Sequence, residues 1–288
     1  MSTFTMLLKH TLFQFVMIFA VFILGGLLLT LLARWMNNSF RQFKWPKFGL
    51  YAFGIIGVPI HEFSHAIFCK IFLHEVKKIK WFDPAGKGGS TGAVTHQYNP
   101  WNLYHRIGHF FIGFGPAIFG SFLMGVLFYL LIPQGRDVLH SLNSFWLASS
   151  ANSEAGYGVF ILKILRAIFN HSNCHSVRFY LFAYLTLCIS SQIELSPEDL
   201  SQATKGVMPI LLTLFMANLI ASFASANWHA QVMSFGRNLT VSFASVFAFA
   251  AILATVCLFF CTITFGLLNA LCGKTGINPF CDTAEKTS

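Results

Sequence analysis

The feature that most constrains this sequence is an apolar run, residues 49–73, that contains three ionisable side chains. His61, Glu62 and His65 lie inside it, in the pentapeptide His-Glu-Phe-Ser-His. A stretch of this length and composition is typical of a membrane-spanning helix, which needs about 20 apolar residues. An ionisable side chain near the middle of a bilayer costs about 2.5–3.5 kcal/mol on the insertion scale. Three of them in one span therefore indicate a function.

The spacing of these residues predicts a metal site. On a helix, His61 and His65 are one turn apart and project from the same face, so both imidazoles can bind one ion. Glu62, beside them, can act as a general base, as in the His-Glu-x-x-His motif of zinc hydrolases. With 11 histidines in the chain, roughly 0.01 accidental matches to this pattern are expected. The alternative is simple pairing of these side chains with polar groups of neighbouring helices.

The composition predicts a polytopic membrane protein. The chain is 55% hydrophobic and only 10% charged, against a usual charged fraction of about 25%. Its net charge of +9 could indicate nucleic-acid binding, but the Lys and Arg residues cluster beside apolar runs, as juxtamembrane charges do. We therefore expect no nucleic-acid partner and an all-α fold in a lipid bilayer. About six transmembrane helices are predicted, at residues 11–33, 49–72, 107–132, 177–193, 207–228 and 240–270.

The remaining segments complete the predicted organisation. A small β-hairpin is expected at residues 78–98, directly after the motif helix, with strands at 78–84 and 92–98 around a Gly-rich turn. The region 133–176 is expected to be an extramembrane loop with an interfacial helix at 159–169. The predicted division is an added first helix and loop (1–48), a metalloprotease core (49–206), added helices (207–272) and a polar tail (273–288).

Elimination narrows the choice of a third metal ligand. A catalytic zinc site usually has three protein ligands, and the chain has ten acidic residues. Glu62 is needed as the base, and Glu75 is too close to His65 along the chain. After the five acids in the hairpin, the long loop and the tail are also set aside, Glu194, Glu198 and Asp199 remain. Asp199 has a second interpretation, because Ser196 and Pro197 before it are typical of a helix start, where an acid stabilises the dipole. Ligand and cap both stay open on these grounds.

A second histidine pair, His105 and His109, also has helical spacing, but no acid lies between its members. We expect this pair to lie at the membrane-interface end of the third span rather than to bind metal. The extended zincin pattern, with a third histidine six residues after the second, is absent, because Ile71 is at that position.

The segment 57–66, Gly-Val-Pro-Ile-His-Glu-Phe-Ser-His-Ala, resembles the motif helix of the site-2 protease family of intramembrane metalloproteases. In that family a membrane-associated hairpin, a span with a Gly-Pro motif and a later helix with an Asp ligand follow. Residues 78–98, Gly115-Pro116 and Asp199 correspond to these parts. Phe119 replaces the Asn that commonly follows the Gly-Pro motif, and Leu200 replaces the Gly that commonly follows the Asp.

This resemblance implies a zinc endopeptidase that cleaves segments of membrane proteins. His61, His65 and Asp199 would hold one Zn²⁺ ion, and Glu62 would be the catalytic base. A multi-pass protein of a bacterial cytoplasmic membrane is the expected setting. Two alternatives remain: a membrane metalloprotease of the prenyl-peptide processing type, which needs a Glu as its third ligand, and a non-enzymatic metal transporter or sensor. The oligomeric state is not predicted.

Overall fold

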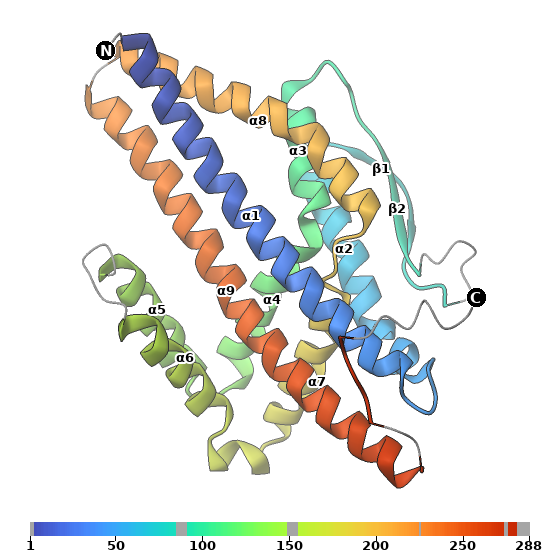
Figure 1. Ribbon diagram of the computed structural model, residues 1–288. Helices are drawn as coiled ribbons and strands as arrows, with labels where there is room; N and C mark the ends of the chain where they lie inside the picture. The colour runs from blue at the N-terminus through green and yellow to red at the C-terminus, as the bar shows by residue number, and fades with distance from the viewer. Residues whose placement is uncertain (1–2, 85–90, 149–154, 225, 274–275, 281–288) are drawn as a thin grey trace.

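The computed structural model describes residues 3–84, 91–148, 155–224, 226–273 and 276–280 (Figure 1). Most of these residues are helical, and the sheet has two strands. The elements in chain order are α1 (Thr3–Arg41), η1 (Leu50–Gly54), α2 (Ile55–Ile71), β1 (Glu75–Lys80), β2 (Ala93–Gln97), α3 (Leu103–Gly113), α4 (Gly115–Leu131), α5 (Gly135–Ala148), α6 (Ala155–Ile168), η2 (His171–His175), α7 (Val177–Gln192), α8 (Pro197–Ala224) and α9 (Ala226–Leu271).

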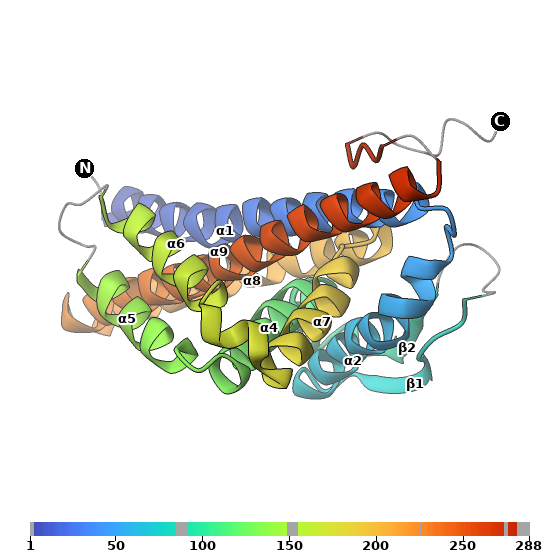
Figure 2. The same ribbon diagram turned by 90° about the horizontal axis from the view of Figure 1, so that it is seen from below.

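The two longest helices, α1 and α9, lie side by side and run in the same direction (Figures 1 and 2). Hydrogen bonds join them at both ends, since Gln14 donates to the carbonyl of Val232 and Asn269 donates to that of Gln42. Phe22 is 1% exposed and lies at their contact with α3. Its ring contacts those of Phe110, Phe111, Phe114, Phe243 and Phe247.

The number of membrane spans is smaller than predicted. Among the described residues, four helices are long and apolar enough to cross a membrane: α1, η1 with α2, α8 and α9. A fifth span arises if α3 and α4 count as one, although they are bent by 61°. Pro116 accounts for the break, because it cannot donate the backbone hydrogen bond that would continue α3. The predicted fourth span corresponds to α7, whose 16 residues are fewer than a perpendicular span needs. Six spans are not confirmed, but a mainly helical fold with helices of membrane-spanning length is.

Two predicted segments have more helix than expected. The region 133–176 contains α6, which corresponds to the helix expected at 159–169, together with α5 and η2. Helices α5 and α6 lie on the side of the bundle away from the hairpin (Figures 1 and 2). Helix α9 already begins at Ala226, so the predicted connection before residue 240 was wrong. The residues between 228 and 240 include no proline. The polar residues among them are compatible with a helix that extends beyond the bilayer.

The hairpin is present but shifted. β1 and β2 pair antiparallel, with Glu75 opposite Gln97 and Lys80 opposite Ala93, and the register shifts between Val76 and Lys78. The first strand therefore starts three residues before the predicted one. The predicted Gly-rich turn at 85–90 lies outside the described residues. In the predicted polar tail, residues 276–280 contact α1, because Asn38 donates to the carbonyl of Pro279.

Candidate metal centre

The two motif histidines project from α2 toward one point. The Nε2 atoms of His61 and His65 are 3.2 Å apart. His65 is 8% exposed, and His61 lines a cavity of about 650 Å³. The helical spacing of the sequence motif is therefore realised with both rings turned to the same side.

A backbone carbonyl orients each imidazole. His61 Nδ1 lies 2.7 Å from the carbonyl oxygen of Gln192, at the end of α7. His65 Nδ1 lies 2.8 Å from the carbonyl oxygen of Ile112, near the end of α3. A carbonyl can only accept, so both Nδ1 atoms carry the proton and donate. Each Nε2 then keeps its lone pair, which is the tautomer that binds metal.

Local sequence explains why these carbonyls are free to accept. In a continuous helix the Ile112 carbonyl would accept from the residue four positions later, which is Pro116 and has no N–H. The Gln192 carbonyl would accept from Ser196, but the Ser196 N–H donates to Asp199 Oδ2 at 2.9 Å instead. The helix break at Pro116 and the start of α8 thus leave one acceptor for each histidine.

Asp199 lies directly beside the two imidazoles. Its Oδ1 is 3.2 Å from His65 Nε2, and its Oδ2 is 3.7 Å from His61 Nε2. The Asp199 N–H also donates to Ser196 Oγ at 3.1 Å, which completes a reciprocal capping box at the start of α8. Cap and metal ligand were open alternatives in the sequence. The geometry confirms the cap and leaves Asp199 in reach of both imidazoles. Gly113 permits this approach, because a Cβ there would lie 2.3 Å from the Asp199 carbonyl oxygen.

The donor set fits a zinc ion. Atoms bound to one tetrahedral zinc at about 2.0–2.1 Å lie about 3.3 Å from one another. The corresponding separations among His61, His65 and Asp199 are 3.2, 3.2 and 3.7 Å. Two imidazole lone pairs and a carboxylate that face one another this closely form an arrangement that a cation stabilises. His61, His65 and Asp199 are therefore residues that could hold a zinc ion.

Glu62 lies in the same cavity and is 6% exposed. The chain between the hairpin strands passes closely over it, since a Cβ on Gly92 would lie 2.5 Å from Glu62 Oε1. Residues 91–94, His96 and Gln202 also line this cavity. The hairpin therefore forms one wall of the space in front of the histidines.

The other candidate residues are not part of this donor group, although Glu194 and Glu198 also line the cavity. Glu194 Oε1 accepts from Arg34 Nε at 2.7 Å, and Glu198 is exposed at the cavity wall. His105 and His109 are in α3, away from His61. The sequence did not predict that the carbonyls of Ile112 and Gln192 would accept from the two imidazoles. Pro116, which has no N–H to donate to Ile112, was the only sequence signal for either of them. Sequence reasoning also missed His96, which the strand pairing brings to the cavity.

The comparisons with known proteins add no relative, since no family model, curated protein or solved structure matches this chain. The functional argument therefore depends on the geometry of His61, Glu62, His65 and Asp199.

Proposed function

We propose that this protein is a zinc-dependent intramembrane endopeptidase of the site-2 protease type, which cleaves peptide bonds in segments of membrane proteins. The observation that supports this most strongly is the convergence of His61, His65 and Asp199 at tetrahedral spacing, with Glu62 in the same cavity. An isolated pair of histidines would suggest only metal binding. The adjacent buried carboxylate supplies the base that hydrolysis needs.

Each residue has a defined role in this proposal. His61 and His65 hold the ion through Nε2, and Asp199 holds it through its carboxylate. Bound zinc would lower the pKa of a coordinated water toward 7 and polarise the scissile carbonyl. Glu62 accepts the proton of the attacking water and then donates it to the amine nitrogen that leaves. The carbonyls of Ile112 and Gln192 keep both imidazoles in the required tautomer throughout.

The cavity also fits the proposed substrate class. A helical segment hides its amides in its own hydrogen bonds, so a membrane protein segment must become extended before it can be cleaved. The cavity is bounded by the hairpin on one side and the start of α8 on the other. In the described residues the sheet has two strands, so each strand has an edge to which an extended segment can pair.

The alternatives have less support. The prenyl-peptide type of enzyme needs a Glu as third ligand, but the acid beside both imidazoles is Asp199, while Glu194 pairs with Arg34. We further propose a bacterial cytoplasmic membrane as the location, on the basis of the motif resemblance alone. Recovery of the protein in another membrane fraction of its host would reject that location.

Removal of zinc is expected to abolish cleavage reversibly. The purified full-length protein in lipid nanodiscs would be treated with a chelator and tested on a panel of single-span reporter proteins with helix-destabilising residues. Cleavage should be lost and return on addition of zinc alone. Cleavage that persists in protein shown to be metal-free would reject the proposal, as would a panel that is not cut by zinc-loaded protein.

Substitution Gly92→Ala is expected to slow cleavage by about 10²-fold, the typical effect of a displacement of about 1 Å in a catalytic group. The new Cβ would lie 2.5 Å from Glu62 Oε1 and 2.7 Å from its Cγ, so the carboxylate must move. Zinc content should stay unchanged, because neither histidine is touched. Gly125→Ala is the matched control, since a Cβ there meets nothing within 4 Å. Equal cleavage rates in the two variants would contradict this view of the hairpin.

A further inference from the structure

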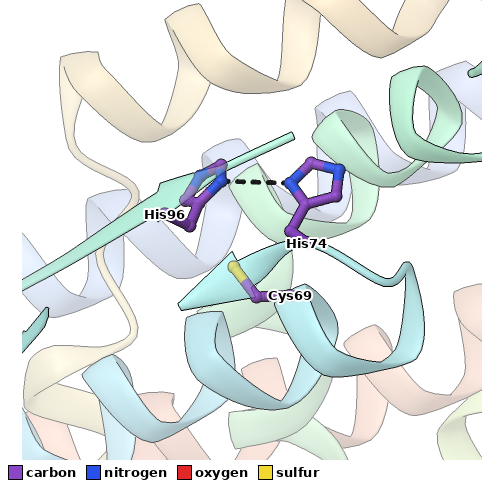
Figure 3. Close-up of side chains that lie close together, drawn as sticks. All are labelled: Cys69, His74 and His96. Atoms are coloured by element: carbon purple, nitrogen blue, oxygen red, sulfur yellow. Dashed lines mark hydrogen bonds between the residues drawn. The ribbon is translucent and has the colours of Figure 1, made fainter. Parts of the chain in front are cut away.

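A second cluster of metal-binding side chains lies one helical turn beyond the candidate metal centre. Cys69 is near the end of α2, His74 directly precedes β1, and His96 is in β2. Their ligand atoms all lie within 4.8 Å of one another. Figure 3 shows the sulfur directed toward the two rings. Cys69 is 0% and His74 4% exposed, so these two side chains are shielded from water, while His96 is half-buried.

A strained turn brings His74 back to Cys69. The His74 N–H donates to the Cys69 carbonyl at 2.7 Å, and the Leu73 N–H donates to that of Lys70. This chain reversal requires a left-handed residue, normally Gly, but here it is Leu73 with a φ of 59°. A non-glycine residue in this conformation costs about 1–2 kcal/mol. Such strain is characteristic of functional sites.

The contacts of the two rings are compatible with a lone pair on each that is directed to an ion. His74 Nε2 donates to the His105 carbonyl at 2.8 Å, so His74 Nδ1 is unprotonated. It faces His96 Nδ1 at 3.0 Å (Figure 3). His96 Nε2 is 2.8 Å from Gln202 Nε2, and a flip of this amide would present its oxygen to His96 instead. With the oxygen presented, His96 Nε2 donates and both Nδ1 lone pairs point into the cluster.

Burial favours the neutral, metal-binding form of both rings. It lowers the pKa of His74 and that of His96 below the usual imidazole value.

His109 supplies an independent observation. It is 3% exposed, and neither of its ring nitrogens has a hydrogen-bond partner among the described residues. Its ring centroid is 5.1 Å from that of His74 and 6.1 Å from that of His96. A buried polar group without a partner costs about 1–3 kcal/mol. Coordination of an ion between these rings would remove that cost.

We propose that Cys69, His74 and His96 form a second zinc site, and that His109, which lies outside the group of atoms within 4.8 Å of one another, turns toward the ion as its fourth ligand. One thiolate and three imidazoles give a closed tetrahedral set, which is characteristic of structural rather than catalytic zinc. The ion would join the end of the motif helix, strand β2 and α3. Because residues 91–94 and His96 line the catalytic cavity, this second ion would hold the hairpin wall in place over Glu62.

The test uses full-length protein in which His61 and His65 are both replaced by Ala, so that its result does not depend on the proposed function. This double variant is titrated with cobalt(II), which takes zinc geometry and absorbs light when a thiolate binds it. We expect one bound cobalt with thiolate-to-metal absorption, and displacement of cobalt by zinc. Absence of bound cobalt, or binding without that absorption, would overturn the proposal. Displacement by cuprous ion but not by zinc would overturn the metal assignment.

Further substitutions in that double variant locate the ligands. Cys69→Ala should abolish the thiolate absorption. It should also weaken cobalt binding by more than about 100-fold, because the loss of a residue that only hydrogen-bonds to a ligand costs about 10–100-fold. Cys261→Ala is the matched control, because Cys261 is also buried but lies in α9. His96→Ala is a second ligand variant. Because His96 is at a half-buried strand position, this substitution leaves no large cavity in the hydrophobic core. Unchanged cobalt binding in His96→Ala, or equal losses in the two cysteine variants, would overturn the site.

Discussion

Replacement of Glu62 by Gln is expected to reduce peptide-bond cleavage by about 10²–10⁴-fold, the usual contribution of a general base. Gln has nearly the same size and shape, so the buried position next to Gly92 should be preserved. Zinc content should equal that of the unmodified protein, because Glu62 is not one of the three residues that converge on the ion. Cleavage of the single-span reporters and metal content would be measured on the same preparations.

The control for this substitution is Glu75→Gln, at a glutamate of β1 that pairs with Lys77 and whose side chain is 69% exposed. Its cleavage rate should not change. Undiminished cleavage by the Glu62→Gln protein would remove Glu62 from the mechanism. A change in zinc flux across proteoliposomes, without any effect on cleavage, would favour the transporter alternative.

Replacement of Asp199 by Asn is expected to lower zinc affinity by more than about 100-fold and to lower the cleavage rate with it. The loss of a residue that only hydrogen-bonds to a metal ligand costs at most about 100-fold, so a larger loss indicates a ligand. The amide oxygen of Asn can still accept from the Ser196 N–H, so the cap of α8 should be retained and thermal stability should fall little. The substitution therefore separates the two roles of Asp199. Zinc affinity would be measured by competition with a chelator of known strength.

Glu198→Gln is the matched control, since it removes the same charge from the adjacent residue, which is exposed in the same cavity. Its zinc affinity should stay close to that of the unmodified protein. Asp199→Ala removes both the ligand and the cap and should also destabilise the fold by about 1 kcal/mol. Unaltered zinc affinity in Asp199→Asn, with destabilisation only in Asp199→Ala, would show that Asp199 is a cap alone.

The sequence predicted the parts of the site that are local. His61 and His65 follow from helical spacing, which is fixed by helix geometry wherever the segment is helical. Asp199 required elimination and a resemblance, because 134 positions of sequence separate it from His65. The carbonyls of Ile112 and Gln192 could not be foreseen as a pair, since backbone groups have no sequence signature. Only the missing donor of Pro116 pointed to one of them.

The fold was predicted less completely for a similar reason. Hydropathy located the helices, but the ends of α7 and α9 depend on local hydrogen bonding and on tertiary contacts that hydropathy does not record. The cluster of Cys69, His74 and His96 could not be predicted, because it depends on a left-handed Leu73 and on the register that places His96 opposite Val76. The spacing of His105 and His109 drew attention to α3, but His109 approaches His74 instead of pairing with His105.

The central claim, that His61, His65 and Asp199 together bind zinc, is tested most directly by zinc X-ray absorption spectroscopy. The measurement would use protein with Cys69→Ala and His96→Ala and one zinc equivalent, so that the second cluster lacks its thiolate and one of its imidazoles. We predict a spectrum with two imidazole ligands, oxygen ligands from a carboxylate and water, and no sulfur, and loss of the imidazole signal when His61 and His65 are also replaced by Ala. A spectrum that keeps two imidazoles after that double replacement would contradict the account.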